Sequence, residues 1–199
     1  MNLPDGIKVN DIPGWREEDA RREIALGSLT EELQDLINHY RQEYPALADD
    51  VEIVAEEGSE ITVVMSYRSA DGFQGFHGGL TKLYAEKGAV IHLVQVQILG
   101  SRCTHFDNVG ANAGENAKID LVQTELGAKE ALSGIKTRLD GTGSSLAINT
   151  VYFGDGSRSV DMNYLAEHAG RKTKSEIHVS GALLDESRKT FRGTINFLK

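Results

Sequence analysis

Cys103 and His105 stand close together in the segment "SRCTHFD", and this pair could bind a metal ion. Thiolate and imidazole groups are ligands that soft metals prefer. A complete site needs further ligands, which other parts of the fold would have to supply. We therefore place the candidate metal or persulfide site at Cys103 and His105. The alternative is a buried thiol beside an exposed imidazole, without a metal.

Asp107 and Asp161 form a second candidate pair, because each follows a glycine, Gly100 or Gly154, by seven residues. Two carboxyl groups about 5–10 Å apart can cleave polysaccharides. Gly134 occupies the intermediate position and interrupts the series. The alternative is that each aspartate bonds to its own backbone in a turn. The pair is the basis of an alternative functional hypothesis, a carbohydrate-active β-helix enzyme.

Three glycine-rich stretches do not match nucleotide-binding or catalytic motifs. "GTGSSL" (141–146) lacks the third glycine of a dinucleotide fingerprint, and "GANAGENAK" (110–118) lacks the Gly-Lys-Ser/Thr ending of a P-loop. We expect both to be turns, and "FQGFHGGL" (73–80) to be a flexible loop. The sequence contains neither a Gly-x-Ser-x-Gly nor a His-Glu-x-x-His motif. These stretches therefore give no evidence of a nucleotide-binding or hydrolytic site.

The composition excludes several classes of function. The 199 residues carry a formal net charge of −9, which argues against non-specific binding to nucleic acid or anionic membranes. No apolar run reaches the roughly 18 residues that span a bilayer, and no secretory signal follows Met1, so we expect a cytoplasmic protein. Cys103 is the only cysteine. The chain alone therefore cannot form a disulfide framework or supply the four thiolates that usually hold an iron–sulfur cluster.

Two regions of different periodicity must position these residues. Residues 1–47 are predicted to form a helical segment, because "GSLTEELQDLINHYRQEYP" has a capping box at Ser28 and Glu31 followed by apolar residues at helical spacing. From Val51 onward the pattern is that of strands. "VEIVAEEGSEITVVMSY" and "LTKLYAEKGAVIHLVQVQILG" each predict two strands around a turn.

Glycines at positions 100, 127, 154 and 181 stand 27 residues apart, each at the end of a predicted strand. A fixed period of this length is typical of solenoids, and it is too short for a propeller blade. Since each repeat contains strands and no helix, we predict a parallel β-helix core over residues 48–199. Glycine at a fixed offset suits a corner that needs positive φ or a close backbone approach. The alternative is an antiparallel sandwich with coincidental spacing.

The repeat also predicts an inward apolar column. Val94, Leu121 and Ile148 each precede one of these glycines by six residues. Ser175 breaks the column, and Ile177 restores it two positions later, which keeps the same face of the strand. Equivalent residues of successive laps would then lie on top of one another and form the core.

The distal half resembles the core of the SufB/SufD family. The segments "ENAKIDLVQTELGA", "LDGTGSS" and "DMNYLAEHAGRKTKSEIHVSGALLDESRKTFRGTINF" occur in the family's order and spacing. The spacing of Asp161, His168 and Ser175 is part of the likeness. So are the Leu183-Leu184-Asp185 turn and the Phe191-x-Gly193-x-Ile195 pattern.

The resemblance covers residues 80–199, with a looser fit over 51–80, and it implies a right-handed parallel β-helix. It also implies a non-catalytic scaffold of cytosolic iron–sulfur cluster assembly. Its expected partners are a SufC-type ATPase and either a SufB/SufD-type paralogue or a second copy of this chain. A transient cluster would be held by the full complex. Of the residues that line the family's internal sulfur path, Gln97 has a counterpart here; the alternative is an inward glutamine bonded to neighbouring backbone.

The sequence also departs from the family pattern. The family continues into further strands and a helical C-terminal region, which carries an Asp-Asp-x-x-Cys-type segment and the ATPase-docking helices. The sequence given stops at Lys199 and does not include this region, so we expect a fragment, a truncated chain or a degenerate relative. An open end of a β-helix exposes unpaired strand edges, which invite pairing with another chain. We therefore expect dimerisation through the C-terminal end. A purely structural interaction module is the third hypothesis.

Overall fold

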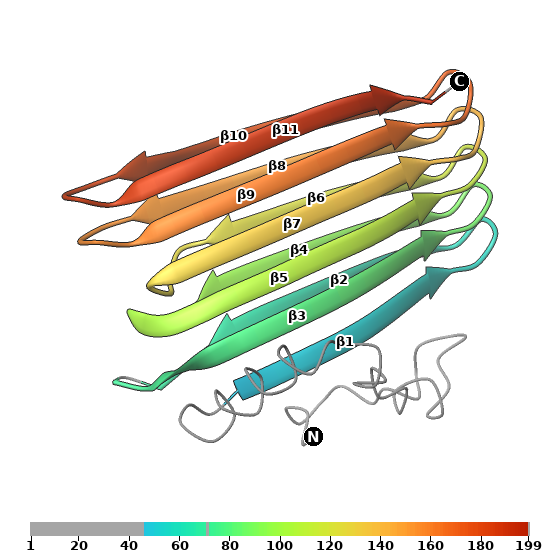
Figure 1. Cartoon of the computed structure of the whole chain (residues 1–199). Coiled ribbons are helices and arrows are strands. Elements are labelled where there is room, and N and C mark those ends of the chain that lie inside the picture. Colours follow the sequence, from blue (N-terminus) through green and yellow to red (C-terminus); the bar gives the residue numbers. More distant parts are fainter. Residues whose placement is uncertain (1–45, 71, 199) are drawn as a thin grey trace, which may run out of the picture. The chain divides into compact units, whose positions relative to one another are not determined.

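The computed structural model describes residues 46–70 and 72–198, and all the regular structure in this part of the chain is β-strand (Figure 1). The predicted helical segment, residues 1–47, lies outside the described residues except for the first residues of β1. The strands are β1 Ala46–Ala55, β2 Glu60–Arg68, β3 Gln74–Ala85, β4 Val90–Ile98, β5 Arg102–Ala113, β6 Lys118–Glu125, β7 Glu130–Leu139, β8 Ser145–Gly154, β9 Ser159–His168, β10 Lys174–Leu183 and β11 Arg188–Phe197.

The strands form two parallel sheets. The six odd-numbered strands pair in the order β1-β3-β5-β7-β9-β11, and the five even-numbered strands pair in the order β10-β8-β6-β4-β2. The chain therefore alternates between the sheets, and each lap lies on the preceding one, as Figure 1 shows. Every strand pair is parallel. This confirms the predicted parallel β-helix and excludes the antiparallel sandwich.

Each strand alternates between inward and outward residues, as the period of two requires. In β4, Ile91, Leu93 and Gln95 are buried, whereas His92 and Val94 between them are partly exposed. The predicted turns between β1 and β2 and between β3 and β4 are confirmed. Of the two other predicted turns, residues 141–144 join β7 to β8. In the second, residues 114–117 join β5 to β6 as predicted, whereas residues 110–113 are the end of β5.

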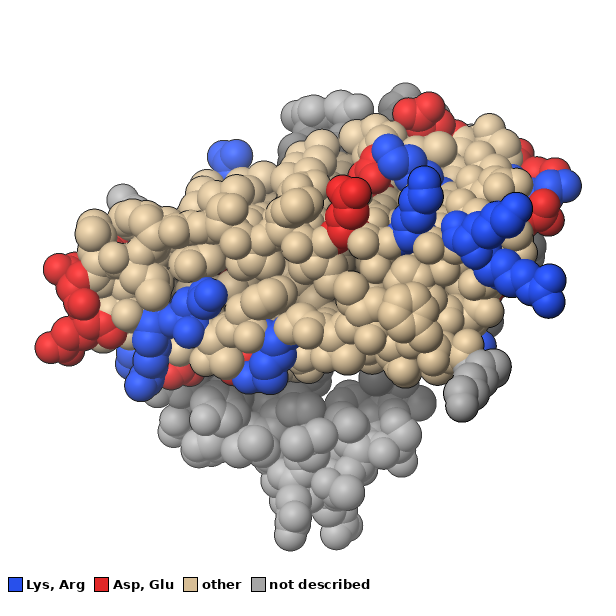
Figure 2. Space-filling view, turned by 90° about the horizontal axis from the view of Figure 1, so that it is seen from above, with Lys and Arg blue, Asp and Glu red and all other residues tan. Residues whose placement is uncertain are grey.

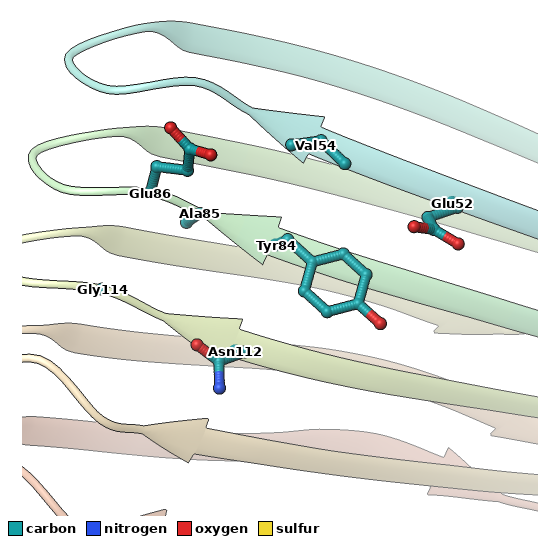
Figure 3. A pocket seen from close by; sticks show the side chains of 7 residues that line it. All are labelled: Glu52, Val54, Tyr84, Ala85, Glu86, Asn112 and Gly114. Carbon is teal, nitrogen blue, oxygen red and sulfur yellow. The ribbon is translucent and has the colours of Figure 1, made fainter. Parts of the chain in front are cut away.

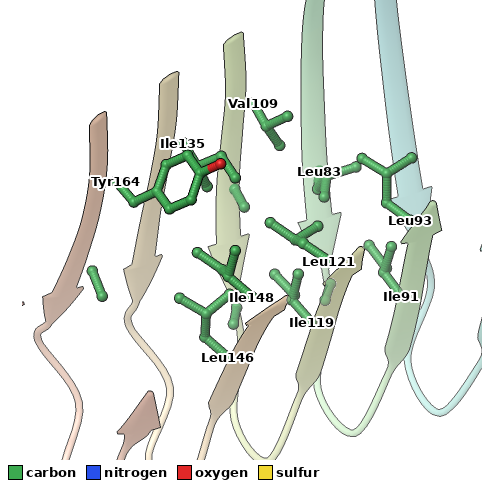
Figure 4. Packing of buried hydrophobic residues seen from close by; sticks show 14 of the residues in the cluster. Leu83, Ile91, Leu93, Val109, Ile119, Leu121, Ile135, Leu146, Ile148 and Tyr164 are labelled. Atoms are coloured by element: carbon green, nitrogen blue, oxygen red, sulfur yellow. The ribbon is translucent and has the colours of Figure 1, made fainter. Parts of the chain in front are cut away.

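In the laps from β3 to β6, the coil interior divides along its length into an apolar half and a polar half. The apolar half lies beside the turns that join each odd-numbered strand to the next strand, and β-branched and leucine side chains fill it (Figure 4). Burying one such side chain contributes about 1.5–3 kcal/mol. The labelled members are Leu83, Ile91, Leu93, Val109, Ile119, Leu121, Ile135, Leu146 and Ile148, together with the ring of Tyr164, whose hydroxyl bonds to the polar residue Gln123.

The lap length varies, and this changes part of the predicted column. Strand β6 is offset from β4 by 28 residues, whereas β8 is offset from β6 by 27. Because a shift of one residue moves a side chain to the opposite face, Val94 points outward and Leu93 takes the inward position. The prediction for Val94 is therefore wrong, but Leu121 stacks on Ile148, and Ile148 stacks on Ile177, as predicted.

The glycines at positions 100, 127, 154 and 181 do not form one ladder. The first two lie just beyond β4 and β6, and the third ends β8, but Gly181 lies inside β10 and pairs with Tyr152. None of the four has a positive φ. The reason for glycine is instead close approach: a Cβ on Gly127 would lie 2.2 Å from the carbonyl oxygen of Leu99.

The glycine-rich segment 73–80 is not the predicted loop, because β3 begins at Gln74. Gly75 and Gly79 are buried and pair with Cys103 and Asp107 of β5. A Cβ on Gly79 would lie 2.4 Å from Oδ1 of Asp107. Glycine at this position makes room for a neighbouring side chain and does not interrupt the strand.

Candidate functional site

The polar half of the interior is the main candidate site. We call it the polar compartment. Its side chains come from both sheets and from successive laps, and all are buried. Buried polar groups nearly always have hydrogen-bond partners, so the exceptions are informative. The members are Tyr67, His77, Gln95, Gln97, His105, Asp107, Gln123, Glu125, Ser133, Thr150 and Tyr164.

A chain of hydrogen bonds crosses the polar compartment from lap to lap. Gln95 Nε2 donates to the Tyr67 hydroxyl at 3.2 Å, and Gln123 Nε2 donates to Gln95 Oε1 at 3.2 Å. The hydroxyls of Tyr164 and Ser133 both donate to Gln123 Oε1, at 2.7 and 2.8 Å. The parallel register produces this chain, because it places Gln95 beside Gln123. The two glutamines are thereby fixed in one orientation.

A second series of side-chain contacts begins at Asp49 of β1 and enters the polar compartment. Asp49 Oδ2 lies 3.0 Å from His77 Nε2, and His77 Nδ1 lies 2.9 Å from His105 Nδ1. The two rings are stacked, and the Tyr67 ring lies against both. Burial, followed by the neighbouring His77, lowers the pKa of His105 to about 3. His105 is therefore neutral at pH 7.

Asp107 and Glu125 are the exceptions in the polar compartment. Both oxygens of Asp107 and Oε1 of Glu125 accept no hydrogen bond from the described part of the chain. Burial raises the pKa of Asp107 to about 6. Burial, with a further contribution from the Asp107 charge, raises the pKa of Glu125 to about 8. The Gln95 side chain and the Asn108 backbone oppose part of the rise in the pKa of Asp107, and the Gln97 amide opposes part of the rise in the pKa of Glu125.

The outer face of the odd-numbered sheet carries a separate, shallow hollow of about 430 Å³ (Figure 3). Tyr84 points outward into it, whereas the neighbouring Leu83 and Ala85 point into the core. The sheet therefore separates this hollow from the polar compartment. The lining residues are Glu52, Val54, Tyr84, Ala85, Glu86, Asn112 and Gly114.

The lap formed by β10 and β11 is the last in both sheets, so each of these strands has one edge without a partner in the described part of the chain. Ile195 and Phe197 occupy inward positions there, paired with Ala166 and His168, yet they are 51% and 73% exposed. Figure 2, which views this end from above, shows a broad uncharged area across its middle. Unpaired edges with exposed apolar side chains are typical of surfaces that pair with another chain.

A family model described as "SUF system FeS cluster assembly, SufBD core domain" matches residues 38–199. The chain belongs to the SufBD core domain family. This confirms the resemblance over residues 80–199 and the looser fit over 51–80, and it extends the match to residue 38. No curated protein matches the chain.

Within this SufBD core, the structure places Gln97 inside the coil, where it is fully engaged. Its Nε2 donates to Glu125 Oε2 and to the Gly127 carbonyl, both at 3.2 Å, and its Oε1 accepts from the Leu99 backbone at 3.1 Å. These bonds match the alternative of an inward glutamine bonded to its neighbours. The role of Gln97 in a sulfur path stays a prediction.

Cys103 and His105 lie in β5, and both side chains point inward. The expected buried thiol is present, but the expected exposed imidazole is wrong, because His105 is 1% exposed. Cys103 Sγ lies 3.7 Å from Ser69 Oγ and 3.6 Å from the Phe73 carbonyl. Among the described residues, no three His, Cys, Asp or Glu side chains are arranged to hold a metal ion. A metal or persulfide role for this pair stays a prediction.

Asp107 and Asp161 do not form the predicted carboxylate pair. Asp107 pairs with Ser133 and points inward, whereas Asp161 pairs with Leu132, points outward and binds Arg192. The two side chains therefore lie on opposite faces of the sheet. This removes the geometric basis of a carbohydrate-active enzyme.

The Asp161, His168 and Ser175 spacing, part of the family likeness, has a structural meaning for two of its members. His168 Nε2 lies 2.8 Å from Ser175 Oγ, and His168 Nδ1 lies 2.7 Å from Thr173 Oγ1. These bonds tie the end of β9 to the start of β10.

In the described part of the chain, no helix is suited to crossing a membrane.

Proposed function

We propose that this chain is a SufB/SufD-type scaffold subunit for iron–sulfur cluster assembly. It pairs with a SufB/SufD-type paralogue, or with a second copy of itself, through the end formed by β10 and β11, and it binds a SufC-type ATPase. The match to the SufBD core domain over residues 38–199 supports this role. The unpaired edges of β10 and β11 support the mode of pairing.

The chain acts in this role as a rigid platform and catalyses no reaction itself. Its single cysteine supports a cluster held by the assembled complex and not by this chain alone. We place this complex in the cytoplasm. The polar compartment lies inside the platform, where Gln97 remains the candidate contact for sulfur.

Co-expression tests the proposal. The chain, expressed from its natural gene with a tag, is purified together with an untagged SufC-type ATPase and a SufB/SufD-type paralogue. Co-elution of the ATPase with a scaffold pair is the expected result. A scaffold pair that never retains the ATPase would favour the purely structural module and contradict the proposal. A chain that elutes alone as a monomer at high concentration would contradict both.

A further inference from the structure

Strand β5 presents few side chains on the outer face of its sheet near the end of the strand. The outward positions there are Gly110 and Asn112, and Gly114 follows the strand directly. A Cβ on Gly110 would meet no atom within 4 Å, and its φ is not positive, so neither crowding nor a turn accounts for this glycine. Glycine inside a strand often marks a place where a ligand or another backbone approaches closely.

Side chains of the neighbouring strands rise on both sides of this floor, because the parallel register places β3 on one side of β5 and β7 on the other. A hollow of about 240 Å³ lies between these side chains. It adjoins the larger hollow of Figure 3, since Tyr84 and Asn112 line both. We call the whole surface the β5 groove. Its walls are Lys82, Tyr84 and Glu86 on one side and Lys136 and Arg138 on the other.

The charge of the β5 groove changes along the strand. Lys82 and Lys136 lie on either side of Gly110, since the register pairs both residues with it. The larger hollow, toward the end of β5, has the carboxylates of Glu52 and Glu86 in its lining and no basic side chain of the described residues. A segment that carries an acidic residue at one end and a basic residue at the other therefore complements the groove.

Ion pairs hold two of the basic side chains without covering them. Lys136 pairs with Glu167 at 3.4 Å and remains 63% exposed, and Arg138 pairs with Asp140 at 2.7 Å and remains 51% exposed. Exposed pairs of this kind contribute little to stability. An acidic group of a partner can therefore share these cations at small cost.

The width of the β5 groove determines the form of its occupant. The walls stand on β3 and β7, which are two strand spacings apart, or about 10 Å. An α-helix with its side chains is about 10–12 Å wide, so it does not fit between the walls, whereas an extended segment does. Asn112 Nδ2 donates to Asp140 Oδ2 at 2.6 Å, so Asn112 Oδ1 is the acceptor that the floor offers to the backbone of such a segment.

We propose that the β5 groove binds an extended segment of a partner protein, with an acidic side chain between Lys82 and Lys136 and a basic side chain beside Glu86. This inference goes beyond the proposed function. The groove lies on the outer face of β3, β5 and β7, and the lap formed by β10 and β11 takes no part in it.

The floor also sets the spacing of the two charged residues in the segment. Gly110 and Gly114 are four residues apart, which is about 13 Å along a parallel strand. The acidic and basic residues of the bound segment should then also be four positions apart, where they point to the same side. The residue midway between them points to that side too and would pack on the Tyr84 ring, which is 42% exposed.

Peptide phage display on the purified full chain tests the β5 groove, with a library of random linear peptides as the probe. We expect the enriched peptides to share an acidic and a basic residue four positions apart. Their affinity is then measured by fluorescence polarisation with synthetic peptides. Gly110→Val raises the floor and should weaken binding by about tenfold. Circular dichroism should show that this variant folds, because its Cβ meets nothing within 4 Å.

Lys136→Gln should weaken peptide binding by about threefold, because it removes one exposed charge. The matched control is Lys118→Gln, since Lys118 is also exposed and paired with an aspartate, Asp120, but lies in the other sheet. This control should bind the peptides as the wild type does.

Three results would overturn the proposal. They are a selection that enriches no peptide, an affinity that Gly110→Val leaves unchanged, and enrichment of purely acidic peptides that inorganic phosphate displaces. The last result would make the groove a simple anion site. Gly110→Val should still co-elute with the scaffold pair and the ATPase, so this proposal and the proposed function can fail separately.

Discussion

His77 and His105 contact each other inside the coil, with their Nδ1 atoms 2.9 Å apart and their ring centroids 4.9 Å apart. They are 28 residues apart in the chain and become neighbours because β3 and β5 pair in parallel. Two adjacent nitrogens at this distance must share one proton as donor and acceptor. Protonation of His105 is opposed first by the burial of the resulting charge and then by the neighbouring His77 ring, which is why the pKa of His105 is low.

The first prediction concerns the stability of the fold at acid pH. The pKa of His105 falls from 6.5 to about 3 on folding, so between these values the unfolded chain binds a proton that the folded chain does not. His105 therefore lowers the free energy of unfolding as the pH falls from about 6.5 toward 3, and has no such effect above 6.5. His105→Asn should reduce this loss. Urea unfolding at pH 4.5 and pH 7 checks it, with the exposed His178→Asn as control.

The second prediction concerns the stability of the fold as the pH rises toward 8. The pKa of Glu125 rises from 4.5 to about 8 on folding, so between these values the folded chain holds a proton that the unfolded chain has lost. Stability should decrease as the pH rises from about 4.5 to 8, by a few kcal/mol in all. Glu125→Gln should flatten this slope, whereas Glu176→Gln on the outside should not. Unfolding is measured in EDTA, and equal slopes in wild type and Glu125→Gln would contradict the prediction.

The fold could be predicted because the strand alternation of apolar and polar residues and the 27-residue glycine spacing are both visible in the sequence. The polar compartment could not be predicted in this way. Gln95 and Gln97 alternate with Val94 and Val96, which point outward although they are apolar. Hydropathy therefore does not tell which face of β4 points inward. A lap of 28 residues in place of 27 then reversed the prediction for Val94. The polar residues of "VQVQ" and "VQTE", at matching positions 28 apart, were the available signal.

The place of His77 inside the coil could not be predicted for a different reason. Its segment contains three glycines, and glycine lowers strand propensity. Here Gly79 is required by the volume of Asp107, a residue 28 positions later. Such a contact is set by the pairing of β3 with β5, which local sequence does not show.

The third prediction tests this role of Gly79. In Gly79→Ala the new Cβ would lie 2.4 Å from Asp107 Oδ1, so the carboxyl group must move within a packed interior. We expect a loss of about 1–3 kcal/mol in the free energy of unfolding. Gly110→Ala is the matched control, because its Cβ would meet nothing within 4 Å and its φ is not positive. Denaturant unfolding should show that control unchanged or slightly more stable.

The fourth prediction tests the inward column. Leu121→Asp or Ile148→Asp should unfold the coil, because each places an unpaired charge in the apolar half at a cost of several kcal/mol. Val122→Asp is the control, since Val122 is the next residue of β6, points outward and is 38% exposed. Circular dichroism and limited proteolysis distinguish the outcomes. A folded Leu121→Asp protein would mean that the face assigned to the core is exposed to water.

The last prediction tests pairing through the C-terminal lap. The backbone N–H groups of Arg188 and Leu198 donate to carbonyls of Arg158 and His168, on the β9 side. Since N–H groups alternate in direction along a strand, that of Thr194 points to β9 and that of Ile195 points to the free edge.

Proline lacks this N–H, so Ile195→Pro should block pairing with another chain while leaving the β9–β11 ladder intact. Thr194→Pro should instead break that ladder and destabilise the last lap. Light scattering of the chain, alone and with a SufB/SufD-type paralogue, should show a monomer for Ile195→Pro, with a melting temperature close to that of the wild type. A dimer that survives Ile195→Pro would show that the subunits pair elsewhere on the coil.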